Sequence, residues 1–232
     1  MRQIILDTET TGLETADGHR IIEIGCLELI DRRPSGKRLH QYINPEREIE
    51  DGALEVHGIS REFLQDKPVF ADVVDDLLEF VEGAELIIHN APFDIGFLDS
   101  ELSLLQRDDR MSDHVTVLDT LELARDLHPG QRNSLDALCR RYEVDNSSRT
   151  LHGALLDAEI LADVYLAMTG GQSDLGLSFQ APDAGDHEPG DIDHGERPPL
   201  QVLQASDEEL AAHEARMKSI QEKSGHCVWN DL

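Results

Sequence analysis

The order of apolar and polar residues along the first 170 positions switches between strand-like and helix-like patterns. Short apolar runs or strict alternation indicate strands, whereas apolar residues three and four apart indicate helices. The predicted strands are residues 3–7, 20–30, 38–43, 85–89 and 115–118. The predicted helices are residues 70–81, 93–105 and 153–168, with shorter helices around Leu121 and Leu135. Residues 31–37, which contain Pro34 and Gly36, are predicted to form the turn between the second and third strands.

The sequence of these elements predicts the fold class. Three strands joined by turns come first, which predicts an antiparallel meander. Later strands alternate with helices, and the apolar run at residues 85–89 is of the kind that parallel sheets bury on both faces. We therefore expect an α/β fold with a mixed five-stranded sheet flanked by helices.

The composition changes after residue 170. Residues 171–206 hold five Gly and four Pro among many acidic residues, which predicts a flexible, disordered linker. Ser206 and Glu209 then have the spacing of a capping box, and the strong helix formers that follow end at Gly225. The expected organisation is a folded domain over residues 1–170, a linker over residues 171–206 and a helical tail over residues 207–232.

The charge balance restricts the kinds of partner. The chain has 48 acidic and 20 basic residues, which give a formal net charge of −28. This excess of acid argues against a basic groove that grips nucleic acid by releasing counterions. Any nucleic-acid chemistry would need metal ions or partner proteins to supply positive charge.

Targeting signals and cysteine usage point to the cytoplasm. No stretch of about 18 apolar residues is present, and Asp7 interrupts the N-terminal apolar run, so neither a membrane span nor a signal peptide is predicted. Cys26, Cys139 and Cys227 are far apart and odd in number. This pattern favours reduced structural thiols over a disulfide framework or a metal site.

Two acidic residues lie on an apolar strand. Asp7 and Glu9 are two positions apart, so their side chains point to the same face of the strand. Two carboxylates held side by side next to a core repel each other, and burying them costs several kcal/mol unless a cation or a proton intervenes. A divalent metal ion is the simplest way to satisfy such a pair.

A third acid follows the buried strand at residues 85–89. Asp94 falls at a strand-to-helix junction, which is where α/β proteins place their sites. The alternative is an acid at a helix N-terminus that only offsets the helix dipole. The residue pattern leaves both interpretations open.

A histidine and an acid flank the start of the last long helix of the domain. Five helical residues turn the chain by about 500°, or about 140° round the axis, so His152 and Asp157 cannot share a helix face. The two side chains can meet if His152 lies on the loop before the helix and Asp157 lies one turn inside it. The alternative for His152 is an ordinary surface group.

Together these motifs resemble those of the DEDDh family of 3′→5′ exonucleases, which have an RNase H-like fold. The resemblance covers residues 2–170. Within the family the chain is most similar to the epsilon branch, the proofreading subunits of bacterial DNA polymerase III. The matching motifs are residues 7–12, 89–94 and 152–157, and the matching runs of the epsilon branch are residues 132–139, 150–158 and 209–216.

The resemblance implies a proofreading exonuclease that hydrolyses the 3′-terminal phosphodiester of DNA and releases nucleoside 5′-monophosphates. His152 would act as the general base that takes a proton from the attacking water. Two divalent cations, Mg²⁺ or Mn²⁺, would clamp the scissile phosphate. The metal ligands that the resemblance implies are Asp7, Glu9, Asp94 and Asp157.

Substrate contacts are also implied by the family. Thr10, Gly12 and Leu13 would line the pocket for the terminal nucleotide. His57 matches a substrate-contacting histidine of the epsilon branch, although a histidine that caps a helix end is an equal alternative. Asn90 would form a hydrogen bond near the metals.

The C-terminal segments suggest partners. Residues 172–179 resemble the short peptides with which polymerase-associated proteins bind the sliding clamp, and a chance apolar cluster is the alternative. Trp229, the only tryptophan, suggests an interface anchor at the end of the tail. By the resemblance, residues 207–232 would bind the polymerase alpha subunit, and a small theta-like subunit would bind the nuclease domain. The linker would keep the nuclease near the primer end.

Two other functions compete with proofreading. An RNA-trimming exonuclease of the same fold is one, and the linker and Trp229 argue against it because such enzymes usually lack a tail of this kind. A catalytically dead scaffold that ties a clamp to a polymerase is the other. The complete set of acids and His152 argues against a scaffold.

Overall fold

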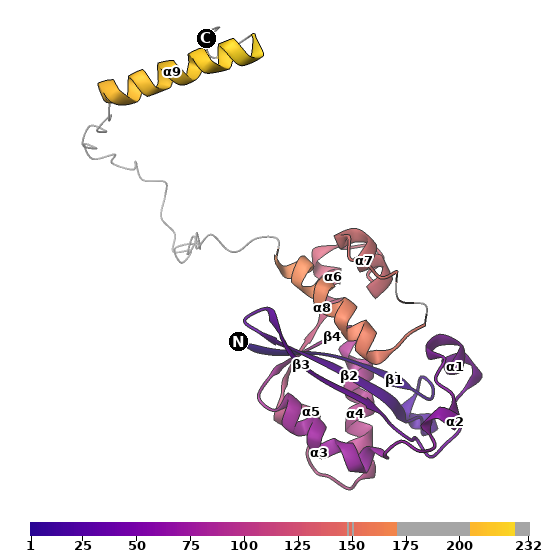
Figure 1. The fold of residues 1–232 in the computed structure, drawn as a ribbon. Helices are drawn as coiled ribbons and strands as arrows, with labels where there is room; N and C mark the ends of the chain where they lie inside the picture. The colour runs from indigo at the N-terminus through magenta and orange to yellow at the C-terminus, as the bar shows by residue number, and fades with distance from the viewer. Residues whose placement is uncertain (148, 150, 171–204, 226–232) are drawn as a thin grey trace, which may run out of the picture. The chain divides into compact units, whose positions relative to one another are not determined.

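The computed structural model describes residues 1–147, 149, 151–170 and 205–225. The chain divides into two compact units, Met1–Ser178 and Phe179–Leu232 (Figure 1). No helix in the described ranges is long and apolar enough to cross a membrane.

The first unit is built on a five-stranded mixed sheet with the strand order β3-β2-β1-β4-β5. The strands are β1 (Arg2–Thr10), β2 (Ile21–Ile30), β3 (Arg33–Tyr42), β4 (Glu85–Ile88) and β5 (Thr116–Asp119). The first three strands form an antiparallel meander, whereas β4 runs parallel to β1 and β5 runs parallel to β4. The mixed α/β sheet predicted from the apolar pattern is confirmed.

Helices cover both faces of the sheet (Figure 1). One core contains residues of α3 (Phe70–Val81), α4 (Ala91–Leu104) and α5 (Met111–His114). The other contains residues of α6 (Thr120–Leu127), α7 (Leu135–Tyr142) and α8 (Ala154–Gly170). Because β1 lies between the two cores, consecutive residues of this strand are buried: Ile4 and Leu6 pack in the first core, and Ile5 packs in the second.

The predicted turn over residues 31–37 is wrong. The connection consists of Asp31 and Arg32 alone, both with positive φ of 47° and 65°, as in the tight turns that match the twist of a hairpin. The third strand therefore begins at Arg33 and includes Pro34. A proline is tolerated there because β3 is the edge strand of the sheet.

Four short helical segments were not predicted. They are η1 (Thr15–Asp17), α1 (Asp51–His57), α2 (Arg61–Leu64) and α5, and each is too short to show a helical period in the sequence. The segment of α1 and α2 matters most because it brings His57 into the first unit's interior, where this side chain is buried.

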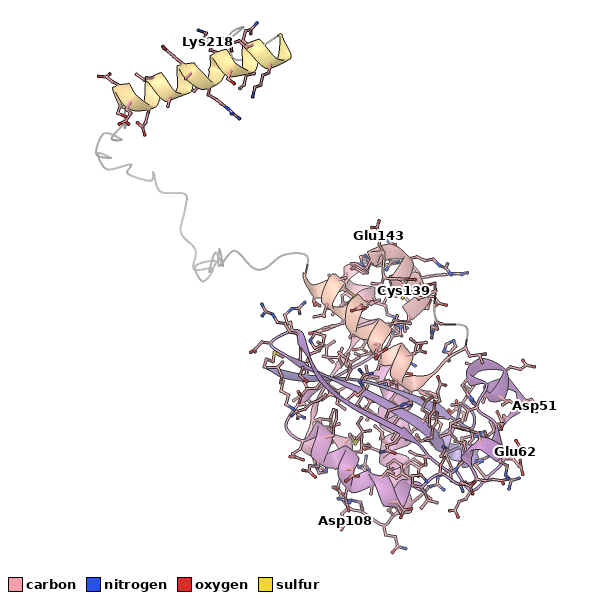
Figure 2. All side chains as sticks on the ribbon, viewed as in Figure 1. Asp51, Glu62, Asp108, Cys139, Glu143 and Lys218 are labelled. Carbon is pink, nitrogen blue, oxygen red and sulfur yellow. The ribbon has the colours of Figure 1, made fainter. Side chains whose placement is uncertain are left out.

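Acidic residues on the surface carry much of the negative charge. Figure 2 shows Asp51, Glu62 and Asp108 projecting outward from the first unit. Cys26 and Cys139 are unpaired and buried, as predicted, and burial raises the pKa of the Cys26 thiol. Both cysteines therefore act as small core residues. Cys227 lies outside the described residues.

The second unit contains the helix α9 (Asp207–Ser224). The predicted capping box is present, since the Ser206 hydroxyl accepts from the backbone N–H of Glu209 and the Glu209 carboxylate accepts from the N–H of Ser206. Gly225 ends the helix in the left-handed region with φ of 72°. Residues 171–204 of the predicted linker, which include the clamp-like peptide at residues 172–179, lie outside the described residues, as does Trp229.

Candidate active site

A cavity of about 550 Å³ opens where β1 and β4 end. It lies at the carboxyl ends of two parallel strands, which is the position where open α/β sheets bind ligands. All five residues predicted to do the chemistry line this cavity, together with Asn90. The lining residues are Asp7, Thr8, Glu9, His89, Asn90, Phe93, Asp94, Leu121, Ser134, Leu135, Asp136, Arg149, His152 and Asp157.

The strand β1 brings the first two acids into the cavity. Asp7 and Glu9 lie on the same side of β1 as Ile5, which packs against the core of α6 to α8. Thr8 points to the opposite side, toward α4, and its hydroxyl donates a hydrogen bond of 2.7 Å to Asp94 Oδ1. Asp7 and Glu9 reach the cavity from one side of β1, and Thr8 links the strand to Asp94 on the other side. Acids from both sides of the sheet therefore meet at the same edge.

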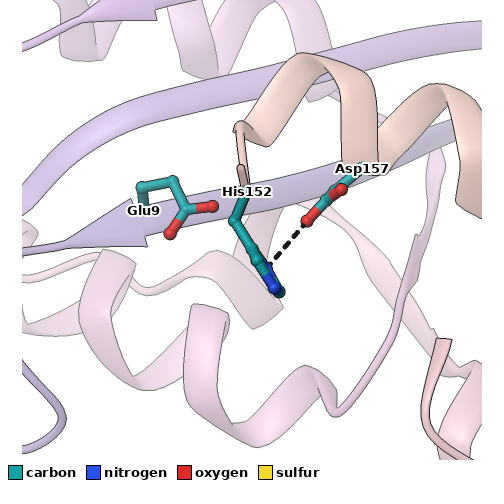
Figure 3. A group of neighbouring side chains, drawn as sticks. All are labelled: Glu9, His152 and Asp157. Carbon is teal, nitrogen blue, oxygen red and sulfur yellow. Dashed lines mark ion pairs between the residues drawn. The ribbon is translucent and has the colours of Figure 1, made fainter. Parts of the chain in front are cut away.

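The start of α8 and the loop before it bring Asp157 and His152 into the cavity. Asp157 lies in the first turn of the helix and is 3% exposed, whereas His152 lies on the loop two residues before Ala154. The His152 Nδ1 atom is 3.2 Å from Asp157 Oδ2 (Figure 3). This arrangement confirms the geometry inferred from the helical rotation. The backbone N–H of His152 also donates to the Val56 carbonyl at 3.1 Å, which ties this loop to α1.

Three of the predicted residues converge most closely. Potential ligand atoms of Glu9, His152 and Asp157 all lie within 4.8 Å of one another, and Figure 3 shows the three side chains facing the same space. Asp7 and Asp94 line the same cavity but lie outside this tight group. The donor set is made of carboxylate oxygens with one imidazole, which suits a hard divalent cation.

Burial and mutual repulsion raise the pKa values of the acids. Burial, then the charges of Asp94 and Glu9, raises the pKa of Asp7 well above its usual range. Burial, then the charge of Asp157, raises the pKa of Glu9 from 4.5 to about 8. Burial raises the pKa of Asp94 to about 7, although the Thr8 hydroxyl opposes this shift. The charge of Arg149 lowers the pKa values of Asp7 and Glu9 but does not offset the rise, so further positive charge would favour the ionised acids and the residues fit a bound divalent cation.

The position of Asp94 agrees with both interpretations of its sequence, a site acid and an acid at a helix N-terminus. It lies in the first turn of α4, as a helix N-terminal acid would, and its buried carboxyl also lines the cavity. Asn90 is the N-cap of this helix, with φ of 67°, and its backbone N–H donates to Asp119 Oδ1 at 3.0 Å. This bond holds the junction between β4 and α4 in place at the edge of the cavity.

Two residues that the sequence pattern did not reveal hold α8 against the sheet. A Cβ atom added at Gly25 would lie 2.3 Å from the backbone of Ala154, so only glycine permits this approach of β2 to α8. The buried Glu23 carboxylate accepts from the Ala154 N–H at 3.1 Å and from His40 Nε2 at 2.6 Å. Glu23 is an acid within the apolar strand β2, directly opposite Glu9. This position is the signal that could have marked Glu23 as a buried acid that needs a partner.

A basic residue of the site was also missed from the sequence. Arg149 lines the cavity, and its guanidinium pairs with Asp157 and with Asp136. It lies three positions before His152, just outside the run of residues that matched the family motif. No periodic pattern marks it, because Arg149 lies in neither a helix nor a strand.

A second cavity of about 330 Å³ adjoins the first, since both share Thr8, Glu9 and Phe93. Four of the predicted substrate contacts line it: Thr10, Gly12, Leu13 and His57. Asn90 lies in the first cavity instead.

Leu13 and His57, two of the predicted substrate contacts in this second cavity, differ in exposure. Leu13 is 75% exposed, so it forms the rim. His57 is the last residue of α1 and is buried; its Nδ1 accepts from the Ile59 N–H at 3.0 Å, and its Nε2 has no hydrogen-bond partner among the described residues. Burial lowers the pKa of His57. It is therefore both a helix-end histidine and a neutral group that faces a cavity.

Comparisons with known proteins agree with this geometry. The exonuclease (RNase_T) family matches residues 4–165. The chain is 54% identical to DNA polymerase III subunit epsilon of Salmonella typhimurium, covering 98% of this chain and 97% of that protein. It is 52% identical to the subunit of the same name from Escherichia coli K12, with the same coverage.

Solved structures share the fold of the first unit. Exonuclease X in complex with 5′ overhanging duplex DNA is 26% identical, with a TM-score of 0.58 over 72% of this chain and 91% of that chain. The nuclease domain of 3′hExo, a DEDDh family member bound to rAMP, is 18% identical, with a TM-score of 0.62 over 72% of this chain and 90% of that chain. The second likeness concerns the fold alone.

Proposed function

The chain belongs to the exonuclease (RNase_T) family and, within it, to the epsilon subunits of DNA polymerase III, and from this premise we propose how its cleft performs the reaction. It is a 3′→5′ proofreading exonuclease that hydrolyses phosphodiester bonds. The residue roles, the metal count and the partner surfaces given below are our proposal.

The observation that carries the proposal is the convergence of acids in one cavity. Glu9 and Asp157 meet His152 within 4.8 Å, and Asp7 and Asp94 line the same space. We assign the four acids as ligands of two divalent cations, Mg²⁺ or Mn²⁺. When bound, such ions lower the pKa of a water and stabilise charge on the phosphate and the leaving 3′ oxygen.

His152 takes the proton from the attacking water. Its side chain is 44% exposed and lies on the loop before α8, so it can approach a phosphate bound above the acids. The ring Nδ1 lies 3.2 Å from Asp157 Oδ2, and the bond from the His152 N–H to the Val56 carbonyl fixes the backbone. A histidine placed this way can act as a general base.

The second cavity receives the 3′-terminal nucleoside. Its walls include the apolar side chains of Leu13, Val56 and Phe93, against which a base and sugar can pack. His57 Nε2, which is buried and without a partner among the described residues, is placed to bind a substrate oxygen.

The tail and linker supply the proposed attachment to the replication machinery. Residues 207–232 would bind the polymerase alpha subunit, and residues 172–179 would bind the sliding clamp. A small theta-like subunit would bind the nuclease domain, and the protein would act in the cytoplasm. These roles rest on the epsilon relatives and on the sequence pattern, and the relatives' name favours proofreading over the RNA-trimming and scaffold alternatives.

The test removes two proposed ligands at once. We expect the variant Asp7→Ala with Glu9→Ala to lose about 10³-fold or more of its activity on 3′-labelled single-stranded DNA in Mg²⁺, because the metals would no longer bind. The matched control is Asp76→Ala with Glu79→Ala, which removes two exposed acids of α3. Retained activity in the first variant, or equal loss in the control, would contradict the proposed metal site. A mispaired primer-template beside an RNA oligomer of the same length would test the substrate.

A further inference from the structure

One cation of the protein already occupies the proposed metal centre. The guanidinium of Arg149 makes a two-pronged contact with Asp157, with Nε 2.5 Å from Oδ1 and Nη2 2.7 Å from Oδ2. Its third nitrogen, Nη1, is 2.8 Å from Asp136 Oδ1. The Arg149 side chain is only 9% exposed, and that of Asp157 only 4%. This geometry is the strong bidentate form of an arginine–carboxylate pair.

The same guanidinium also holds the proposed general base. Arg149 Nη2 lies 2.8 Å from His152 Nδ1. A guanidinium can only donate, so in this contact Nδ1 accepts and the ring proton is on Nε2. Asp157 and His152 are thus both engaged by one positive side chain.

We propose that Arg149 is a positioning residue that neutralises Asp157 in the metal-free protein and is displaced toward Asp136 when a divalent cation binds. The inference rests on the proposed metal centre. Both oxygens of Asp157 face the guanidinium, so a divalent cation on the same carboxylate would meet a fixed positive charge. Asp136, whose side chain is 48% exposed, offers the guanidinium a second anionic partner, which Nη1 already contacts at 2.8 Å.

Two consequences follow from this arrangement. The cluster of buried acids has a counter-charge before metal binds, which limits their repulsion during folding. Metal binding also releases His152 from Arg149, so that the base becomes free to accept a proton only when Asp157 has exchanged its partner. Arg149 therefore couples the readiness of His152 to occupation of the metal centre.

The experiment measures Mn²⁺ binding to the full-length protein without DNA, using the electron paramagnetic resonance signal of free Mn²⁺. We expect Arg149→Gln to bind Mn²⁺ roughly tenfold more tightly than wild type, because a competing charge is removed. Arg149→Lys keeps the charge but loses the fork, so its affinity should lie between the two. The matched control is Arg38→Gln, which removes an exposed arginine paired with Glu159 of α8 and outside the cavity.

Thermal melting separates this role from a merely structural one. In EDTA, Arg149→Gln should melt below wild type, and it should gain more from added Mn²⁺ than wild type does. If Arg149 only fastened the loop to α8, Arg149→Gln would bind Mn²⁺ equally or more weakly and would melt lower with and without metal. That result overturns the inference. If Arg149→Gln does not fold, Arg149→Lys takes its place, and an affinity for Mn²⁺ no tighter than that of wild type overturns the inference equally.

The outcomes also distinguish this inference from the proposed function. Wild-type protein that binds Mn²⁺ normally, beside an Arg149→Gln variant of unchanged or weaker affinity, overturns only the role of Arg149. Wild-type protein that binds no Mn²⁺ overturns the metal centre and the role of Arg149 together.

Discussion

Replacing Glu9 by glutamine should change how the stability of the metal-free protein depends on pH. Glu9 is 9% exposed, and burial followed by the charge of Asp157 raises its pKa from 4.5 to about 8. Since the folded-state pKa lies above the unfolded value, the folded protein binds more protons than the unfolded chain between these two pH values. The free energy of unfolding therefore falls as the pH rises through this window.

The size of the effect follows from the shift. One proton is worth about 1.4 kcal/mol per pH unit. Between pH 5.5 and 7.5, both inside the window, wild-type protein in EDTA should lose about 3 kcal/mol of unfolding free energy through Glu9 alone. Glu9→Gln removes this titration, so its stability relative to wild type should rise by the same amount over the same interval. For a chain of this size, that corresponds to about 6 to 12 °C in melting temperature.

The assay is urea denaturation followed by circular dichroism, in EDTA, at pH 5.5 and 7.5. The matched control is Glu159→Gln, which replaces a half-exposed acid of α8 outside the cavity. Its stability relative to wild type should change by less than about 0.5 kcal/mol between the two pH values. Saturating Mg²⁺ should then stabilise wild type more than Glu9→Gln, because the variant lacks a ligand.

The reasoning fails if the stability difference between Glu9→Gln and wild type in EDTA stays constant from pH 5.5 to 7.5. It also fails if the difference moves in favour of wild type. Either result would mean that Glu9 is ionised in the metal-free protein and that its charge is already neutralised; the charge of Arg149 already acts in this direction, since it lowers the pKa of Glu9.

Three further predictions concern the base, the packing of α8 and the tail. His152→Ala should lower turnover by about 10² to 10⁴-fold, while calorimetry shows nearly unchanged Mg²⁺ affinity; a large loss of affinity would make His152 a ligand. Gly25→Ala should lower both nuclease activity and melting temperature, since its Cβ would meet the backbone of α8 at 2.3 Å, whereas Gly96→Ala, with open space at its Cβ, should raise the melting temperature slightly. Deleting residues 171–232 should spare activity on free oligonucleotides and abolish co-purification with the polymerase; loss of both would place the tail in the catalytic unit.

Local patterns in the sequence predicted most of the side-chain placements within the site. Asp7 and Glu9 could be placed on one face because side chains alternate along a strand, and a buried strand with two acids needs a cation. His152 could be placed on a loop because helical rotation forbids it from sharing a face with Asp157. The two placements depend only on the geometry of single elements, and the structure agrees with both of them, whereas the need for a cation stays a prediction.

Other parts of the fold depend on contacts between distant segments. Glu23 and Gly25 matter because β2 touches the start of α8, about 130 residues later in the chain, and no local pattern records that approach. The early start of β3 depends on two turn residues with positive φ and on its position at the sheet edge. The short helix that carries His57 has too few residues to show a period.

The sequence by itself determined that Asp7 and Glu9 share a strand face and that His152 lies outside the helix of Asp157, since strand alternation and helical rotation are properties of neighbouring residues; the meeting of all four acids was implied by the family resemblance. Only the tertiary structure decided how their charge is balanced. The raised pKa values of Asp7, Glu9 and Asp94 arise from burial first and then from the charges of neighbouring acids, and the cation beside Asp157 is Arg149, from a loop with no regular pattern. Electrostatic energy depends on distance and burial in space, and neither is recorded in the order of residues.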